Sequence, residues 1–311
     1  TGGKKPTIAA GFLGASLYKK ENNIDILYVD FEEYKNDNPL YGSEYLTILL
    51  NPNDLFSTVE RKALKELFQA HQYRGARKLS KDIVNRLKHI SKIYSDYNID
   101  YQINELERIY FFLKLYEMRN DFNYYQCQID NSLLTDKEIK GLKALLDAKK
   151  RIDKLSMELP VYKQDKNYNY LVCQSIYEEF KNDDSLIYLA LERYIGALRY
   201  KSIDYQSYIL RLASVIELSG IIMYEGKYSN LNEKIKYINS SNLRNQLFGL
   251  KNERNNLSLT HGFGFLDTPK EGYESAVIEY VCMAFKKSRK EVDNIIEELK
   301  FRTFDEVLHG L

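Results

Sequence analysis

The chain has no tryptophan, only three cysteines and only four histidines among its 311 residues. The cysteines, Cys127, Cys173 and Cys282, lie far apart and form no C-x-x-C pair. This spacing excludes both the disulfide framework of a small secreted domain and a zinc-binding motif. We therefore expect buried, reduced thiols in a cytoplasmic protein.

Histidine is also too sparse to build a metal centre. The four imidazoles belong to His71, His89, His261 and His309, and none lies near another or at a metal-ligand spacing from a carboxylate. The sequence therefore predicts no metal site. We expect His71 and His89 to be ordinary surface residues.

The sequence also has no large net charge and no long apolar run. The 45 Lys and Arg residues balance 44 Asp and Glu residues, for a net charge of +1. A protein that binds nucleic acid through bulk charge is more basic, so any RNA contact must be local. No apolar run reaches the roughly 18–20 residues that span a bilayer. The opening Thr1-Gly-Gly-Lys-Lys-Pro6 is not a signal peptide, so we expect no membrane association.

The sequence divides into an α/β start and a long helical remainder, and the predicted fold class is therefore mainly α. Residues 1–56 combine a helix over Thr7–Lys20 with strands over Ile24–Phe31 and Glu44–Leu50, the first of a type buried in a parallel sheet. One helix and two strands do not form a stable doubly wound sheet, so we expect an upstream part of this fold. Capping boxes at Ser57–Glu60 and Thr135–Glu138 predict helix starts, and a polar run after Pro160 suggests a boundary near residue 170.

The most informative segment is a helical stripe near the C-terminal end. Its members fall at steps of four and three residues, which place them on one helix face: Leu243, Leu247, Leu250, Arg254, Leu257 and His261. The stripe begins with leucines and then includes a cation and an imidazole, and Gly262 follows as a helix stop. A charged group on a face that packs inward needs a partner, water or a function.

Arginine and histidine together suit the metal-free cleavage of RNA. The 2′-hydroxyl must lose a proton, the phosphorane charge must be stabilised, and the leaving oxygen must gain a proton. His261 suits proton transfer because the reference pKa of histidine is about 6.5, and the planar cation of Arg254 can hold two phosphate oxygens. Asn255 adds a hydrogen-bonding group beside Arg254. The alternative is a core histidine that is bonded to a backbone carbonyl.

A second pair with the same spacing, Arg302 and His309, is a weaker candidate. It lies two residues from the chain end, where helices fray, and Thr303 follows its arginine. Among the other charged groups, we expect Glu192–Arg193 and Arg211…Glu217 to be intrahelical salt bridges. We expect the basic cluster Arg74-Gly-Ala-Arg77-Lys78 to be a solvated helix face.

The N-terminal turn is the other candidate binding segment. Gly2 and Gly3 allow a backbone to approach a phosphate or a ribose closely. The turn is no P-loop, because the upstream glycine is absent and Lys5 replaces the Ser or Thr that follows Gly-Lys. From these residues alone, the favoured interpretation of Thr1–Lys5 is an ordinary turn.

Together these segments resemble a known enzyme family. Arg254-Asn255-x5-His261-Gly262 is similar to the R-N-x(4–6)-H signature of HEPN ribonucleases, and Thr1-Gly2-Gly3-Lys4-Lys5-Pro6 resembles the T-G-G-T-K turn of a CARF domain. In this order, with helices between them, they resemble the CARF–HEPN ribonucleases of type III CRISPR systems, above all the Csm-type member with a helical insert. The resemblance implies the C-terminal part of a Rossmann-like CARF sensor over 1–56, a helical connector over 57–170 and an all-α HEPN nuclease over 171–311.

The resemblance also implies a mechanism. Arg254, Asn255 and His261 from two subunits of a homodimer would form one metal-independent site, which cleaves single-stranded RNA and leaves 2′,3′-cyclic phosphates. Thr1, Gly2, Gly3, Lys4 and Lys5 would bind cyclic tetra- or hexa-adenylate as an allosteric activator, in antiviral defence, with no cofactor. Lys4 replaces the usual threonine, which puts in doubt whether this site cleaves its activator. Two alternatives remain: a non-catalytic dimeric nucleotide sensor, and a HEPN toxin ribonuclease unrelated to CRISPR.

Overall fold

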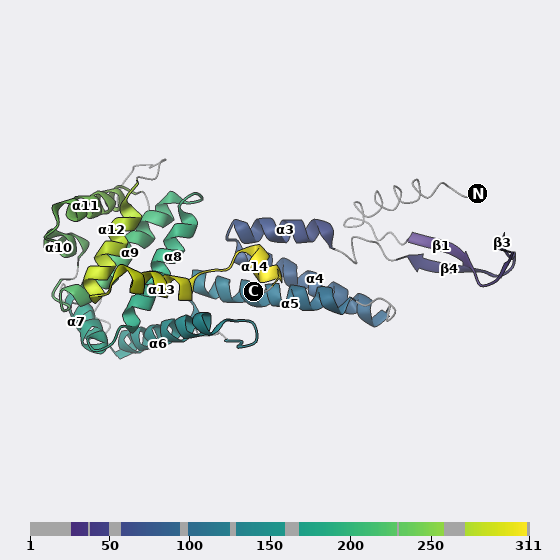
Figure 1. Ribbon diagram of the computed structural model, residues 1–311, viewed down its shortest axis with the longest axis horizontal. Coiled ribbons are helices and arrows are strands. Elements are labelled where there is room, and N and C mark those ends of the chain that lie inside the picture. Colours follow the sequence, from purple (N-terminus) through teal and green to yellow (C-terminus); the bar gives the residue numbers. More distant parts are fainter. Residues whose placement is uncertain are drawn as a thin grey trace. The chain divides into compact units, whose positions relative to one another are not determined.

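The protein is mainly α-helical, as predicted. The computed structural model describes residues 26–36, 38–49, 57–93, 99–124, 129–158, 168–228, 230–257 and 271–309. These residues form twelve helices and four short strands (Figure 1). They divide into two compact units, one of residues 1–117 with 303–311 and the other of residues 118–302.

The strands form an antiparallel hairpin. β1 (Ile26–Phe31) pairs with β4 (Glu44–Leu49), with Ile26 opposite Leu49 and Phe31 opposite Glu44. Between them, β2 (Tyr34–Lys35) pairs with β3 (Asn38–Pro39). Two strands were predicted correctly, but their assignment to a parallel sheet is wrong. The segment that joins β1 to β4 is itself the β2–β3 hairpin. It does not contain the crossover helix that a parallel pair of strands needs. The described residues contain no α/β Rossmann-like sheet.

The first unit contains α3 (Thr58–Gln69), α4 (Tyr73–Ile93), α14 (Phe304–His309) and most of α5 (Asp100–Asn120). An edge-to-face aromatic cluster joins these helices through Phe68, Tyr73, Tyr116 and Phe304. The capping box predicted at Ser57 is wrong. Ser57 makes no side-chain cap, and its hydroxyl accepts a hydrogen bond from Arg86 instead (2.8 Å).

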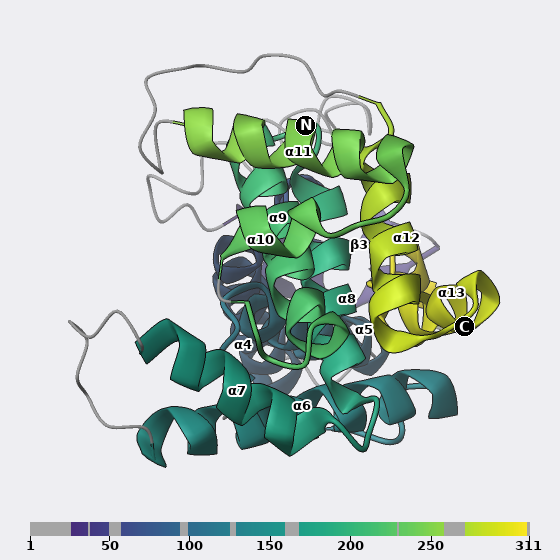
Figure 2. The same ribbon diagram turned by 90° about the vertical axis from the view of Figure 1, so that its left-hand side faces the viewer.

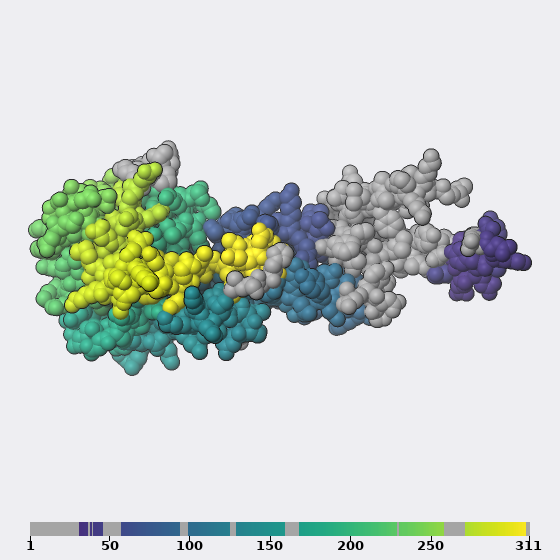
Figure 3. Space-filling view, in the orientation of Figure 1, coloured from purple at the N-terminus to yellow at the C-terminus, as the bar shows by residue number. Residues whose placement is uncertain are grey.

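The second unit has α8 (Ser185–Tyr200), α9 (Tyr205–Met223) and α12 (Tyr273–Phe285) at its centre. Around them lie α6 (Asp136–Glu158), α7 (Tyr168–Phe180), α10 (Leu231–Lys236), α11 (Ser241–Asn256) and α13 (Arg289–Leu299). In Figure 3, α13 lies against α6. The Glu298 carbonyl leaves room only for a glycine at Gly141, since a Cβ there would stand 2.7 Å from it.

The capping box predicted at the start of α6 is confirmed. The Thr135 backbone donates to Glu138 (2.7 Å), and the Glu138 backbone donates to the Thr135 hydroxyl (3.3 Å). The central helix α9 is long and apolar enough to cross a membrane by length and composition alone. In its most apolar 18-residue window, 56% is buried inside the protein, as in the core helix of a globular domain.

The intrahelical salt bridge predicted for Glu192 is wrong. Glu192 of α8 accepts two hydrogen bonds from Arg119 at the end of α5 (2.9 and 2.6 Å), and both side chains are 3% exposed. Arg119 also donates to the Leu299 carbonyl and lies over the Phe301 ring. Glu217, predicted to pair with Arg211, pairs instead with Arg254. Partners on other helices are invisible to a local sequence pattern.

Candidate functional site

The predicted leucine stripe forms the buried face of α11. Ser240 caps this helix by accepting a hydrogen bond from the Leu243 backbone (3.4 Å). Leu243, Leu247 and Leu250 are at most 1% exposed, so the stripe prediction is confirmed along the helix. In Figure 2, α11 lies across α9 and α12, and its three leucines belong to the hydrophobic core of this unit.

The prediction that one helix carries both Arg254 and His261 is wrong. α11 ends at Asn256, and Leu257 has an extended backbone (φ −68°, ψ 142°) while its side chain remains buried. Two consecutive asparagines, Asn255 and Asn256, have low helix propensity and favour the end of a helix over its interior. His261 lies outside the described residues.

The last turn of α11 distributes three polar side chains in different directions. Successive helical residues are rotated by about 100°, so Glu253, Arg254 and Asn255 cannot share one environment. Glu253 points into the core and is 4% exposed, Arg254 is about one-third exposed, and Asn255 is exposed. This arrangement places a cation and an amide at the surface, next to a buried carboxylate.

Arg254 is held at the surface by a carboxylate from a second helix. Its guanidinium Nη2 lies 3.1 Å from Oε1 of Glu217 in α9, and the two side chains are 32% and 35% exposed. A partly hydrated pair of this kind contributes little to folding stability. It does restrict the orientation of the planar guanidinium at the surface.

Glu217 sits among further cations. Its backbone carbonyl accepts a hydrogen bond from Nζ of Lys234 in α10 (2.7 Å), a lysine that is 1% exposed. Burial lowers the pKa of Lys234, and the electrostatic influence of Cys173 and Glu217 opposes this shift. Burial likewise lowers the pKa of Arg193 in α8, and Glu217 opposes that shift as well. We call Glu217, Arg254, Arg193 and Lys234 the Glu217 cluster.

The Glu217 cluster holds three basic side chains against one carboxylate. Lys234 is buried, so the cation of the cluster that an anion at the surface would meet is Arg254. An oriented guanidinium at a surface can stabilise the charge that develops on a phosphorane. The cluster contains no histidine, so a histidine that transfers the proton must come from another part of the chain.

Sequence reasoning missed Glu253, the buried carboxylate of the same helix turn. It accepts hydrogen bonds from the hydroxyls of Tyr205 and Tyr273 (2.8 Å each). Burial raises the pKa of Tyr273, and the bond to Glu253 raises it further, so this hydroxyl stays protonated as a donor. The only sequence signal was an acidic residue one position from the leucine stripe. The bonds lock the end of α11, and with it Arg254, to α9 and α12.

The remaining predicted site residues fall in two groups. Thr1, Gly2, Gly3, Lys4 and Lys5 lie outside the described residues. Arg302, of the weaker second pair, donates two hydrogen bonds to Glu138 (2.7 and 2.5 Å) and is 9% exposed. Its guanidinium therefore stabilises the fold and does not face a ligand.

The candidate metal ligands of the described residues do not gather. No group of three or more His, Cys, Asp or Glu side chains there is arranged to hold a metal ion. Cys173 and Cys282 are free thiols, and burial raises the pKa of both. Cys173 is buried as predicted, Cys282 is partly exposed, and Cys127 lies outside the described residues.

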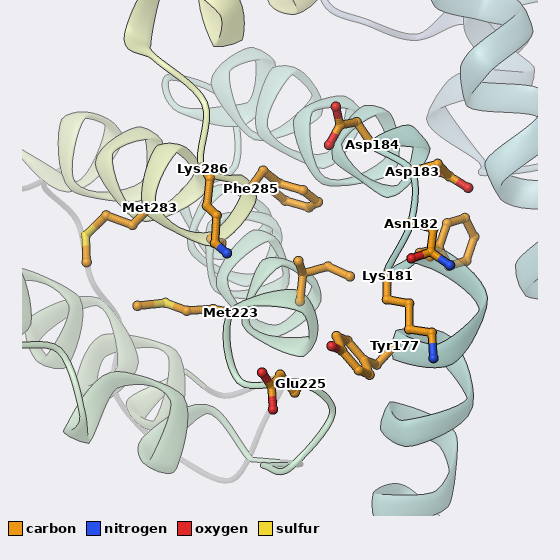
Figure 4. Close-up of a pocket in the computed structure, with 13 residues that line it drawn as sticks. Tyr177, Lys181, Asn182, Asp183, Asp184, Met223, Glu225, Met283, Phe285 and Lys286 are labelled. Carbon is orange, nitrogen blue, oxygen red and sulfur yellow. The ribbon is translucent and has the colours of Figure 1, made fainter.

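A cavity of about 390 Å³ lies elsewhere in the second unit, where α7, α9 and α12 end (Figure 4). Its lining combines apolar side chains such as Met223 and Phe285 with charged residues. The carboxylates are already paired: Asp183 with Arg151, Asp184 with Lys287, and Glu225 with Lys227. This lining contains neither Arg254 nor Glu217, and it brings no nucleophile together with a base.

No protein-family model matches this chain, and no curated protein is significantly similar to it.

Proposed function

We propose that the protein is a metal-independent endoribonuclease of the HEPN type, activated by cyclic oligoadenylate. One observation carries the catalytic half of the proposal. Arg254 and Asn255 lie at the surface at the very end of α11, and Glu217 holds the arginine in place. Four residues after Leu257, the chain carries His261. A fixed cation, an amide and an imidazole are the groups that cleavage by a 2′-hydroxyl uses.

In this proposal each side chain has one role. Arg254 holds the non-bridging phosphate oxygens as negative charge develops, and Asn255 donates a hydrogen bond beside it. His261 moves the proton. Two copies of the α11 end meet across the two-fold axis of a homodimer, so that one composite site binds single-stranded RNA. The products end in a 2′,3′-cyclic phosphate, because the attacking hydroxyl belongs to the substrate.

The sensing half of the proposal is supported by the N-terminal motif. Residues 1–56 would be the C-terminal part of a CARF domain, and Thr1–Lys5 would bind cyclic tetra- or hexa-adenylate. Residues 57–170 would connect this sensor to a nuclease domain over 171–311. A ring that binds one arrangement of the dimer more tightly would shift the nuclease site toward its active arrangement.

One observation favours a second candidate, a non-catalytic dimeric nucleotide sensor. Arg254 already has a carboxylate partner within its own chain. An arginine of this kind also serves as a structural group at an interface. A HEPN toxin unrelated to CRISPR is the third possibility, and it differs from the first in binding no cyclic adenylate.

The substitution His261→Ala separates these functions. The wild-type protein and the variant are incubated with a fluorogenic RNA in EDTA, with and without cyclic tetra- or hexa-adenylate. We expect the variant to lose at least about 100-fold in cleavage rate and to keep its dimer by size-exclusion chromatography. Near-normal cleavage by the variant ends the catalytic assignment. No cleavage by the wild type with either ring supports the sensor, and ring-independent cleavage supports the toxin.

A further inference from the structure

The helix α4 has an unusual charge for a protein that is nearly neutral. It carries seven lysines and arginines against a single acid, Asp82, whereas the whole chain has a net charge of +1. Two of these cations are about one-third exposed and pair with carboxylates of neighbouring helices. Arg86 pairs with Glu60, and Arg77 pairs with Glu117. The remaining five lie on the outer face.

These five outer cations form a straight line. Arg74, Lys78, Lys81, Lys88 and Lys92 are separated by steps of four, three, seven and four residues, which keeps them on one stripe of the helix. We call them the α4 stripe. All five are exposed. Its ends, Arg74 and Lys92, are eighteen positions apart, or about 27 Å at the helical rise of about 1.5 Å per residue. Asn85 fills the position between Lys81 and Lys88, and its amide can also donate to a phosphate.

Most of the α4 stripe is not needed to hold the helix in place. Within the described residues, Lys78, Lys81 and Lys92 make no ion pair, whereas Arg74 pairs with Glu117 and Lys88 with Glu107. The apolar face of α4 anchors the helix instead, through buried residues such as Ile83 and Leu87. Three cations of this rigid row, Lys78, Lys81 and Lys92, therefore have no carboxylate partner among the described residues and can meet a ligand.

The chemistry of the stripe indicates which ligand. A membrane-binding amphipathic helix would have to insert its apolar face into the bilayer, but in α4 that face is buried inside the protein. Protein partners are bound through apolar and aromatic anchors, and the outer face has none between Arg74 and Lys92. Cations that follow one another along a single helix face, with no apolar centre, match a phosphodiester backbone.

We propose that the α4 stripe binds the phosphate backbone of RNA without reading its sequence. This inference is independent of the proposed cleavage, because a protein that cleaves no RNA can still bind it through this face. It gives a nearly neutral chain the local contact with nucleic acid that its net charge does not supply.

The test compares two triple variants in binding to a labelled 20-nucleotide 2′-O-methyl RNA, which cannot be cleaved at a 2′-hydroxyl. The stripe variant carries Lys78→Glu, Lys81→Glu and Lys92→Glu. The control carries Lys137→Glu, Lys150→Glu and Lys290→Glu, three exposed lysines of the second unit, for the same change in charge. Fluorescence anisotropy is measured between 50 and 200 mM salt, and circular dichroism checks that both variants fold.

We expect the stripe variant to bind at least tenfold more weakly than both the control and the wild type. Its salt dependence, as the slope of log K against log salt, should fall by about 2, since three phosphate contacts at about 0.7 each are removed. Duplex RNA and single-stranded DNA of equal length show which backbone geometry the stripe prefers. Equal binding by the two variants, or wild-type binding to anionic vesicles and not to RNA, overturns the proposal.

Discussion

Two arginine–glutamate pairs of the second unit show how the same chemistry serves different ends. Arg119 and Glu192 are each 3% exposed and share two hydrogen bonds. The Leu299 carbonyl and the Phe301 ring complete the environment of this arginine. Arg254 and Glu217 are about one-third exposed, and Nη2 of the arginine lies 3.1 Å from Oε1 of the glutamate. Both pairs join two helices, but only the second is partly exposed to water.

The two pairs differ in how much folding stability is lost when one member is removed. Removing one member of a buried pair leaves an uncompensated charge in the protein interior, whereas water replaces the lost partner of an exposed pair. The buried pair therefore serves to stabilise the folded state. The exposed pair is free to give up its partner, or to share it, when an anion approaches.

The largest expected effect on stability is that of Glu192→Gln. The substitution leaves the buried Arg119 cation without its counter-charge, and we expect a loss of about 3–5 kcal/mol in the free energy of unfolding. Urea denaturation followed by circular dichroism measures this loss. As a control, a double variant with Arg119→Met and Glu192→Leu should recover most of it, since an apolar pair carries no unpaired charge. A loss below 1 kcal/mol for Glu192→Gln contradicts the comparison.

We expect a smaller loss of stability on substitution of Glu138, which pairs with Arg302. The Glu138 side chain is 13% exposed and that of Arg302 is 9% exposed. Burial alone would raise the pKa of Glu138, but hydrogen bonds from Arg302 and Thr135 outweigh burial and lower the pKa. A carboxylate whose folded pKa is lowered stabilises the fold above its ordinary pKa of 4.5, and this contribution disappears as the pH falls through the lowered value.

Glu138→Gln should therefore cost about 1.5–3 kcal/mol at pH 7. The difference in unfolding free energy between wild type and variant should stay constant down to about pH 5 and shrink below pH 4.5. Denaturation series at pH 7, 5 and 4 measure it. A difference that grows on acidification would mean that the ion pair does not stabilise the folded state.

The smallest effect on stability is expected for Glu217→Gln, with at most about 1 kcal/mol lost. If Arg254 is catalytic, the same substitution should slow RNA cleavage by about tenfold, because the guanidinium loses the carboxylate that orients it. Glu279→Gln, at an exposed position of α12, is the matched control for charge and should leave cleavage unchanged. Lost stability with unchanged cleavage would make Glu217 a structural residue only.

Parts of the fold followed from local sequence patterns. The leucine stripe identified the buried face of α11. Patterns of this kind work because apolar periodicity is set by the geometry of a single helix. The capping box at Thr135 succeeded for the same reason, because all of its atoms lie within four residues.

The errors involve long-range partners or the ends of elements. Glu192 lies next to Arg193 in the sequence, but its partner Arg119 is 73 positions away. Ser57 fits the sequence pattern of a capping box, but its hydroxyl accepts a hydrogen bond from Arg86. The sequence predicted that α11 extends to His261, because the spacing of the stripe continues to that residue. The helix ends at Asn256 instead, where two asparagines have low helix propensity. Glu217 and Glu253 define the surroundings of Arg254, and neither could be assigned to it from spacing.

The central claim is that Arg254 stabilises the transition state of RNA cleavage, and the ends of the RNA products test it most directly. Wild-type protein and Arg254→Ala are incubated with a single-stranded RNA in EDTA and cyclic adenylate, and the products are analysed by mass spectrometry. We predict 2′,3′-cyclic phosphate ends from the wild type, and at least about 100-fold less product from an Arg254→Ala protein that remains folded and dimeric. Equal amounts of the same products from both proteins would contradict the account.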